Sequence, residues 1–365
     1  MSLKADLYCN KKIFEDEIDL IFKADWIFAG LTTQLQNHLD FLTLEIGNHP
    51  IVVQNKHGEI KAFQNICTHR FNKILSTPQG NAPLTCGYHN WSFNDDGFPQ
   101  NAFNSKEFNF TESDKDCLKL KRYNLSIVGK FIFINLSEST KTISEHLGHW
   151  QSELESISNN IGNEYYNGFL PHNCNWKLMV ENVLECYHCS SVHNTTLYGK
   201  FGIGHKRIED IEYINSHSKC HFPKKENFNA DIDPKQLKLL AFLDERGMKH
   251  ESFYHFYIYP NLFLSSTEGK SFYIGQLLPI DESHSNLKIH FYEPFLESSK
   301  NKAIRSIIGE EVVTKSIEIL NEDKLILEQV QKNMVVMKST IPFLSKEEER
   351  IENFHSAYKS NMKTQ

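Results

Sequence analysis

The spacing of apolar positions changes several times along the first half of the chain, and each change predicts a different kind of element. Over residues 8–30 the apolar side chains follow helical spacing, which predicts an amphipathic helix that runs into a buried segment. From about 40 to 136 apolar residues alternate with polar ones or form β-branched and aromatic runs, which predicts a small all-β domain. Residues 140–165 are polar and are expected to be helical.

The second half of the chain repeats this change of spacing. Residues 194–250 contain several Gly, Lys and Asn without a clear period, so we expect loops here and treat part of the region as a candidate lid or channel wall. Strand-like runs between 252 and 296 lie close together and predict an antiparallel sheet. Residues 300–337 are expected to form one long helix, and the charged tail after Pro342 is expected to be peripheral.

Composition is that of an ordinary globular protein. The 365 residues suffice for two domains with cores of their own, and hydrophobic and charged residues make up 40% and 23% of the chain. The formal net charge of −7, without a block of basic residues, argues against a nucleic-acid partner. Because there is no apolar signal segment and no apolar run of about 18 residues, we expect a cytoplasmic protein without membrane contact.

The eight cysteines are interpreted as thiols or metal ligands, not disulfides, because a chain of this length without a signal peptide is expected in a reducing compartment. Cys186 and Cys189 match the Cys-x-x-Cys of redox dithiols and zinc sites. No second pair stands at zinc spacing and no βαβ pattern surrounds them, so they are expected to be packing residues. Seven histidines are likewise expected to be ordinary surface or core residues: His172, His205, His217, His221, His250, His255 and His290.

Residues 181–193 hold the densest group of candidate metal ligands, with Glu185, His188 and His193 within nine residues. Neutral imidazole suits iron, zinc, copper and nickel. Two histidines five residues apart point about 140° away from each other on a regular helix. The helix must therefore end or bulge between them, and Ser190-Ser191 is the expected place. The alternative is a surface helix with two ordinary histidines.

Two Cys-His pairs lie in the predicted β-domain. Cys67-Thr-His69 is followed, after sixteen residues, by Cys86-Gly-Tyr-His89. Two thiolates and two imidazoles are the ligand set of a Rieske [2Fe–2S] centre, in which two histidines replace two cysteines on one iron. A Cys2His2 zinc site is the alternative, but zinc fingers usually place both histidines on a helix. The β setting favours the Rieske interpretation.

A carboxylate far along the chain is the candidate third ligand of a mononuclear iron. The apolar positions of residues 319–334 have helical spacing, and Asp323 lies within that stripe while Glu322 lies to its side. A carboxylate on a core-facing stripe is costly unless it is paired or binds a metal. Iron that activates O2 needs two His, one carboxylate and open positions. An Asp paired with a buried Arg or a backbone group is the alternative.

On these motifs the sequence resembles, over nearly its whole length, the catalytic alpha subunit of Rieske-type non-haem iron oxygenases, the aromatic-ring-hydroxylating oxygenase family. The shared stretches are residues 25–30, both cluster loops, and residues 175–177, 185–193 and 321–331. Two positions depart from the family. Asn90 replaces a Gly and tolerates a left-handed backbone. Phe71 also replaces a frequent Gly but tolerates that backbone poorly, so the first loop is expected to follow a different path.

The resemblance implies an α+β fold: an all-β Rieske [2Fe–2S] domain, and a catalytic domain whose antiparallel sheet wraps around a long helix (helix-grip type). The expected domains are an N-terminal helical segment packing with the catalytic domain (1–38), the Rieske domain (39–138) and the catalytic mononuclear iron domain (139–365). The implied ligands are Cys67, His69, Cys86 and His89 for the cluster and His188, His193 and Asp323 for Fe(II).

The resemblance further implies a homotrimer in which Glu185 connects His188 with His89 of the adjacent protomer. Two alternatives remain open. Glu185 could orient His188 within its own chain, or Glu181, on the same helical face, could make the connection.

The implied function is that of a terminal oxygenase. Such an enzyme uses O2 and electrons from a separate NAD(P)H-dependent reductase or ferredoxin to hydroxylate or oxidatively demethylate a small organic substrate. The form Glu-Cys-Tyr-His-Cys is most similar to the branch that acts on choline, betaine and carnitine-like quaternary amines, and aromatic residues in 252–274 are candidate cation–π contacts. Aromatic-ring or aryl-ether oxidation is the second interpretation. An electron carrier with the Rieske centre alone is a remote third, opposed by the chain length and the second ligand set.

Overall fold

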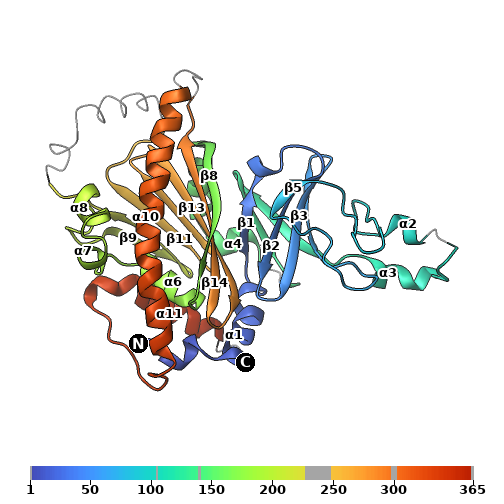
Figure 1. Cartoon of the computed structure of the whole chain (residues 1–365), viewed down its shortest axis with the longest axis horizontal. Helices are drawn as coiled ribbons and strands as arrows, with labels where there is room; N and C mark the ends of the chain where they lie inside the picture. Colours follow the sequence, from blue (N-terminus) through green and yellow to red (C-terminus); the bar gives the residue numbers. More distant parts are fainter. Residues whose placement is uncertain (1, 104–105, 139–140, 227–247, 297–301, 363–365) are drawn as a thin grey trace. The chain divides into compact units, whose positions relative to one another are not determined.

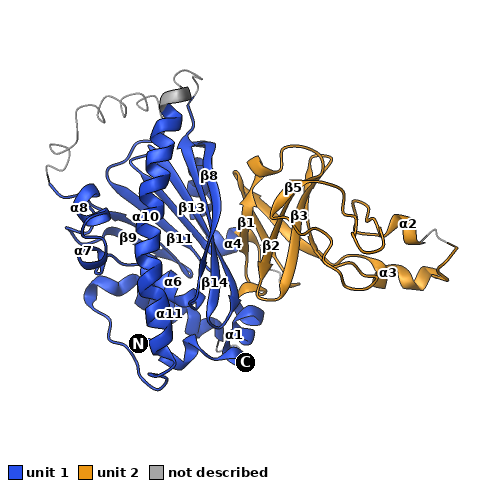
Figure 2. Cartoon of the chain, in the orientation of Figure 1, with its two compact units in different colours: residues 1–21, 144–365 blue, residues 22–143 orange. Residues whose placement is uncertain are grey.

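The computed structural model describes residues 2–103, 106–138, 141–226, 248–296 and 302–362. The chain divides into two compact units, residues 1–21 with 144–365 and residues 22–143 (Figure 2). The sequence placed the boundaries at 38/39 and 138/139. Residues 227–247, which belong to the candidate lid, lie outside the described residues.

Unit 22–143 is built on an antiparallel sheet in the order β1-β7-β6-β4-β3-β2-β5. Its strands are β1 (Ile27–Leu31), β2 (Asp40–Ile46), β3 (His49–Lys56), β4 (Glu59–Gln64), β5 (Gln79–Asn81), β6 (Arg122–Val128) and β7 (Phe131–Asn135). The Gly-Lys turn predicted between the last two strands is confirmed, and Gly129 has the positive φ of 57° that the tight turn requires. The short helices are η3 (Thr32–Gln34), α2 (Gln100–Phe103), η4 (Glu112–Asp114) and α3 (Lys115–Leu118).

The other unit is built on a second antiparallel sheet, in the order β8-β14-β13-β12-β11-β10-β9. Its strands are β8 (Ile161–His172), β9 (Glu209–Ile214), β10 (His217–Phe222), β11 (Phe253–Ile258), β12 (Leu262–Thr267), β13 (Ser271–Asp281) and β14 (His284–Pro294). The sheet predicted for 252–296 is confirmed. Strands β9 and β10 were expected to be loop, because their polar and charged residues give no clear alternation.

One long helix, α10 (Lys302–Met334), lies across this sheet and packs on β8 and β14, as predicted for residues 300–337 (Figure 1). The other helices are η1 (Ala5–Tyr8), α1 (Lys11–Glu17), η2 (Ile18–Phe22), α4 (Ile143–Leu147), α5 (Trp150–Asn159), α6 (Trp176–Val183), α7 (Cys189–Val192), α8 (Leu197–Phe201), η6 (Lys346–Glu348) and α11 (Glu349–Met362). The predicted fold class is confirmed. Among the described helices, none combines the length and the apolar character needed to cross a membrane.

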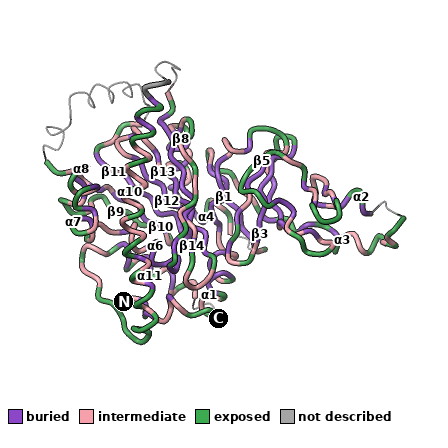
Figure 3. The backbone as a smooth tube through the Cα atoms, in the orientation of Figure 1, coloured by how far each residue is buried: buried purple, intermediate pink, exposed green. Residues whose placement is uncertain are grey.

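A buried carboxylate fastens the helix that leads into the candidate metal segment. Glu17, at the end of α1, accepts hydrogen bonds from Trp176 Nε1 (2.7 Å), from Lys177 Nζ (2.5 Å) and from the Tyr358 hydroxyl (2.6 Å). These partners lie on α6 and α11, and Glu17 and Lys177 are fully buried. Figure 3 shows how burial varies along the backbone of each unit. A buried ion pair is tolerated only when further hydrogen bonds complete it, as they do here.

The expectation of a peripheral tail after Pro342 is therefore wrong. Helix α11 is charged along much of its length, but it buries Arg350, Ile351, Phe354, His355 and Tyr358 inside the catalytic unit.

Candidate metal centres

The two Cys-His loops of unit 22–143 share one backbone geometry. In the first loop the Phe71 N–H donates to the Cys67 carbonyl at 2.9 Å, and in the second the Asn90 N–H donates to the Cys86 carbonyl at 2.9 Å. Both thiols are buried and interact with each other. The four donor side chains predicted from the sequence therefore converge at the tips of paired loops.

The donor set fits an iron–sulfur cluster. The rings of His69 and His89 lie 4.6 Å apart, and His69 also stacks on Trp91 at 4.6 Å. The buried Nδ1 atom of His69 has no hydrogen-bond partner among the described residues, which leaves it available to a metal. Burial alone would raise the pKa of Cys86, but N–H groups, that of Tyr88 first, outweigh burial and lower it. A thiolate is the form that binds metal.

The prediction that Phe71 would change the path of the first loop is wrong. Phe71 adopts a positive φ of 60°, close to the 57° of Asn90, so the two loops match. The Phe71 side chain is 79% exposed and meets little steric resistance from its surroundings. The loop therefore accepts a left-handed phenylalanine at the conformational cost that a glycine would avoid.

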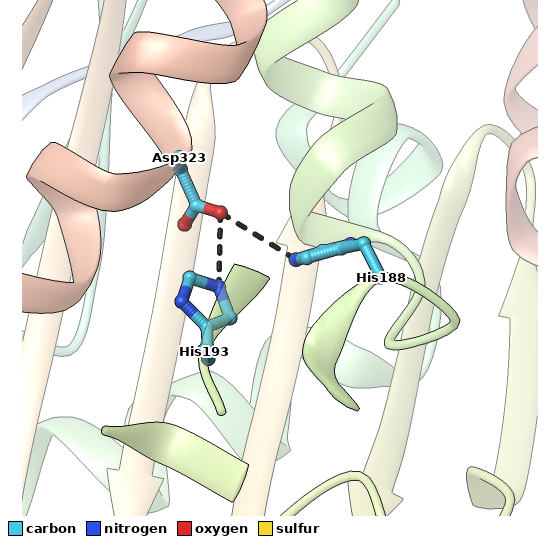
Figure 4. A group of neighbouring side chains, drawn as sticks. All are labelled: His188, His193 and Asp323. Atoms are coloured by element: carbon cyan, nitrogen blue, oxygen red, sulfur yellow. Dashed lines mark ion pairs between the residues drawn. The ribbon is translucent and has the colours of Figure 1, made fainter. Parts of the chain in front are cut away.

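In the catalytic unit, His188, His193 and Asp323 converge on one point (Figure 4). His188 precedes α7, His193 follows it, and Asp323 comes from α10. Asp323 Oδ1 lies 3.0 Å from His193 Nε2 and 3.5 Å from His188 Nε2, and one ligand atom from each residue lies within 4.8 Å of the others. Donors about 2.1 Å from one ion and at right angles to each other would stand roughly 3 Å apart.

Two glutamates fix which nitrogen of each histidine faces that point. Glu185 accepts a hydrogen bond from Nδ1 of His188, and Glu322 accepts one from Nδ1 of His193 at 2.7 Å. In a neutral imidazole the other nitrogen then carries a lone pair, so both Nε2 atoms present acceptors to Asp323. Asp323 Oδ1 is buried and makes no hydrogen bond among the described residues. Three acceptors that face one another are satisfied together by a metal cation, or by protons on the histidines.

The electrostatics of this group also favour a cation. Burial alone would lower the pKa of His188, but Asp323 and Glu185 outweigh it and raise the pKa to about 10. Burial would raise the pKa of Asp323, but His188 and His193 outweigh it and hold the pKa at about 2. In the metal-free chain His188 therefore holds a proton that a divalent ion would displace.

Helix geometry brings the two histidines together in a different way from the one predicted. Ser190 and Ser191 lie inside the one-turn helix α7, not at a break. His188 stands just before α7 and His193 just after it, where the backbone leaves the helical conformation (φ −103°, ψ 28°). The two side chains can then converge although they are five residues apart.

Cys186 and Cys189 form a disulfide, so the expectation that all eight cysteines are thiols or metal ligands is wrong for this pair. Cys-x-x-Cys was the signal for this pairing, but it was set aside for want of a βαβ setting. Cys186 still has a packing role, because it contacts a buried cluster formed by Ile203, Cys220 and Phe222.

Glu185 and Glu181 occupy distinct environments. Glu185 also accepts hydrogen bonds from the backbone N–H groups of Tyr187 and His188, so within the chain it both shapes the turn and orients His188. Glu181 accepts hydrogen bonds from the Tyr8 hydroxyl and from His355 Nε2 (2.9 Å). Among the described residues, it makes no hydrogen bond to His188 or His193. Sequence reasoning missed Glu322 as the partner of His193. Its only signal was its place beside Asp323.

A Rieske-type β-unit together with a helix-grip unit that carries a His-His-Asp group defines the class of Rieske non-haem iron proteins. Residues 25–112 match the model of the Rieske [2Fe–2S] domain, and residues 154–364 match the model described as the ring-hydroxylating alpha subunit, catalytic domain. The chain belongs to the family of ring-hydroxylating alpha subunits. This family implies a Rieske cluster and a mononuclear iron, and the donor sets described above fit both.

Two curated relatives show how far the similarity extends. The chain is 32% identical over 194 residues to the glycine betaine monooxygenase oxygenase subunit of Pseudomonas aeruginosa, covering 53% of this chain and 44% of that one. It is 27% identical over 201 residues to the 2-halobenzoate 1,2-dioxygenase large subunit of Burkholderia cepacia, covering 52% and 43%. The matched region thus spans less than half the length of these relatives.

A solved structure has the same fold over nearly the whole chain. It is a quaternary ammonium Rieske monooxygenase whose study concerns carnitine oxidation by gut microbiota and inter-subunit electron transfer. It superposes with a TM-score of 0.74 at 18% identity and covers 99% of this chain and 93% of the other.

Replacing Phe71 with Gly should stabilise the β-unit slightly. A left-handed residue other than Gly costs about 1–2 kcal/mol, which the substitution recovers. The greater freedom of Gly in the unfolded chain offsets about 0.4–1 kcal/mol of that stabilisation. We expect the free energy of unfolding to rise by up to about 1.6 kcal/mol, measured by denaturant titration followed through cluster absorption. Tyr88→Gly, an exposed aromatic in the other loop without a positive φ, should lower it. Equal losses in both variants would contradict this account.

Replacing Asp323 with Asn should remove one iron and leave the cluster. The wild-type chain should carry about three irons, two in the cluster and one at the triad, and the variant about two, because an amide does not neutralise the cation. Metal analysis and visible absorption measure both quantities. Glu318→Gln, an exposed position on the same helix, is the matched control and should keep three. A variant that retained three irons would remove Asp323 from the ligand set.

Proposed function

We propose that this chain is the terminal oxygenase component of an O2-dependent enzyme. The observation that carries the proposal is the convergence of three acceptor atoms, from His188, His193 and Asp323, with both histidine tautomers fixed by glutamates. Two His and one carboxylate leave coordination positions open, which is the arrangement of non-haem Fe(II) oxygenases. The pairing of this group with a Rieske domain supports the same assignment.

In this proposal each polar residue has a separate task. When bound, the cluster would supply single electrons and the mononuclear iron would supply the activation of O2. Cys67, His69, Cys86 and His89 would hold the cluster, and His188, His193 and Asp323 the iron. Glu185 and Glu322 would hold the Nδ1 protons of the two histidines, so that neither ring can turn away from the metal.

The proposed substrate is a small quaternary amine. Glycine betaine and carnitine, after which two of the similar proteins are named or described, carry a trimethylammonium group. Hydroxylation of a carbon next to nitrogen gives a hemiaminal that collapses to formaldehyde and the demethylated amine. The relative named for 2-halobenzoate supports aromatic oxidation as the second candidate. All three compounds also carry a carboxylate.

The proposed assembly is a cytoplasmic homotrimer that receives electrons from a separate NAD(P)H-dependent reductase or ferredoxin. Glu185 would connect His188 with His89 of the adjacent protomer. Two exposed aromatic residues support a protein contact at each centre: Tyr88, beside His89, is 55% exposed, and Tyr187, beside His188, is 62% exposed. Exposed aromatic side chains are enriched where proteins meet.

O2 uptake with a reconstituted reductase tests the function. We expect glycine betaine or carnitine to increase O2 uptake, with formaldehyde released in about equal amount, and Asp323→Asn to abolish this increase. Benzoates form the parallel series for the second candidate. Lack of substrate-dependent uptake in a fully iron-loaded protein, or equal uptake in the Asp323 variant, would refute the assignment.

Replacing Glu185 with Gln should preserve both metal centres and reduce coupled turnover by roughly ten- to a hundredfold, the usual loss when the hydrogen-bond partner of a metal ligand is changed. Iron content and substrate-dependent O2 uptake are the two measurements. Normal turnover would exclude any role for Glu185 in electron delivery.

Mixed oligomers separate the bridging role of Glu185 from a purely orienting one. A Cys67→Ser variant lacks the cluster and an Asp323→Asn variant lacks the mononuclear iron, so neither should turn over alone. Co-assembled protomers should recover activity if electrons cross between chains. Co-assembly without recovery would confine the path to one chain and leave Glu185 only its contact with His188.

A further inference from the structure

A buried guanidinium lies inside the catalytic unit, and the described residues give it no carboxylate partner. Arg350 of α11 is 1% exposed, and its acceptors among the described residues are all neutral: Ser218 Oγ (3.1 Å), the Ser218 carbonyl (3.5 Å), Cys220 Sγ (2.9 Å) and His255 Nδ1 (3.1 Å). Burial raises the pKa of Cys220 to about 11 despite the nearby guanidinium, so this thiol stays neutral. Among the residues that the structure describes, no carboxylate pairs with Arg350, and a buried unpaired charge is costly.

His255 extends this group with a second unsatisfied atom. Because its Nδ1 accepts a hydrogen bond from Arg350, the neutral ring carries its proton on Nε2. Burial, followed by the charge of Arg350, holds the pKa of His255 well below its usual value, so the ring stays neutral. The Nε2 atom is buried and has no hydrogen-bond partner in the described part of the chain. A buried donor without an acceptor is destabilising.

The unsatisfied donor lies on the same face of the sheet as the candidate iron ligands. Strand register places Cys220, His255, Ser265, Tyr273 and Phe291 opposite one another across five strands, so their side chains share a face. Asp323, on α10, is close enough to Tyr273 for its charge, after burial, to raise the pKa of Tyr273. His255 and Tyr273 are two strands apart, or about 10 Å.

A second contact links the two groups. Cys186, two residues before His188, packs on the buried cluster that contains Cys220, and Cys220 accepts a hydrogen bond from Arg350. The Arg350–His255 pair and the metal-binding segment thus both contact one buried cluster.

We propose that His255 Nε2, positioned by Arg350, binds a carboxylate oxygen of the substrate and selects small organic carboxylates. This inference rests on the proposed oxygenase function. The carboxylate supplies an acceptor for the orphaned N–H and the negative charge that Arg350 lacks. A hydroxyl would satisfy the donor but not the charge. His255 contacts the ligand, and Arg350 acts by fixing the tautomer of His255 and by its charge.

Matched ligands test the proposal without turnover. Glycine betaine and choline share a trimethylammonium group, but glycine betaine carries a carboxylate where choline carries an alcohol. Benzoate and benzyl alcohol form the corresponding aromatic pair. Calorimetric titration of the iron-loaded protein, without reductase, should show at least tenfold tighter binding of the carboxylate in one pair. Absence of such a preference in both pairs, including lack of binding by either carboxylate, would overturn the proposal.

Variants assign the preference to these residues. His255→Phe should weaken carboxylate binding about ten- to a hundredfold, as expected for loss of a charge-assisted hydrogen bond, and should change alcohol binding less than about threefold. His255→Gln, which keeps an N–H donor, should restore part of the loss. His221→Phe is the matched control, because His221 pairs with Tyr254 in the adjacent row, on the opposite face. Unchanged carboxylate binding in His255→Phe would refute the role.

Arg350 variants provide an independent test of the charge. Arg350→Met should remove the preference for carboxylate over alcohol, and Arg350→Lys should keep part of it. Cluster absorption and unfolding midpoints establish that each variant is folded. In reductase-coupled assays the defect should appear in KM more than in kcat. Carboxylate binding that depends on His255, in a protein without substrate-dependent O2 uptake, would refute the oxygenase function and retain the binding site. Turnover that does not depend on His255 would refute the binding site and retain the oxygenase function.

Discussion

Three electron-pair donors that face one another dominate the catalytic unit. Two imidazole nitrogens and one carboxylate oxygen repel each other unless a cation or protons lie between them, and Asp323 Oδ1 is buried where water cannot help. Glu185 and Glu322 add to the constraint, because each holds the Nδ1 proton of a histidine and so keeps the Nε2 lone pair inward. The site is therefore arranged for a metal before any metal binds.

The fold has to hold this repulsive group together from distant parts of the chain. His188 and His193 flank a one-turn helix, and Asp323 arrives on a helix that begins more than a hundred residues later. Helix α6, which leads into the metal segment, is anchored by the hydrogen bonds of the buried Glu17 to α6 and α11. Both terminal segments thus contribute to the position of the ligands, although neither contains one.

What the sequence could predict follows from what local patterns encode. Spacing identified the long helix and the strands between 252 and 296, and ligand chemistry picked out the Cys-His pairs and Asp323. Pairings between distant segments leave no local trace. Neither the contact of Glu322 with His193 nor the burial of Arg350 in a charged helix has a signal in its own neighbourhood. The prediction that Phe71 would avoid a positive φ rested on its backbone preference alone, and the exposure of its side chain could not be known from the sequence.

The charges of the catalytic unit are separated along one face of its sheet. Three carboxylates lie at the metal site, Asp323 within the triad and Glu185 and Glu322 beside its histidines, and a divalent ion would leave one negative charge there. Arg350 contributes a positive charge that no carboxylate among the described residues neutralises, and its partner His255 lies about two strands from Tyr273. In a buried, weakly screened region such a pair creates a field along the face. A ligand with a cationic group toward the triad and a carboxylate at His255 aligns with that field, whereas the reverse orientation opposes it at both ends. The field would thus select which end of a dipolar substrate lies next to the metal.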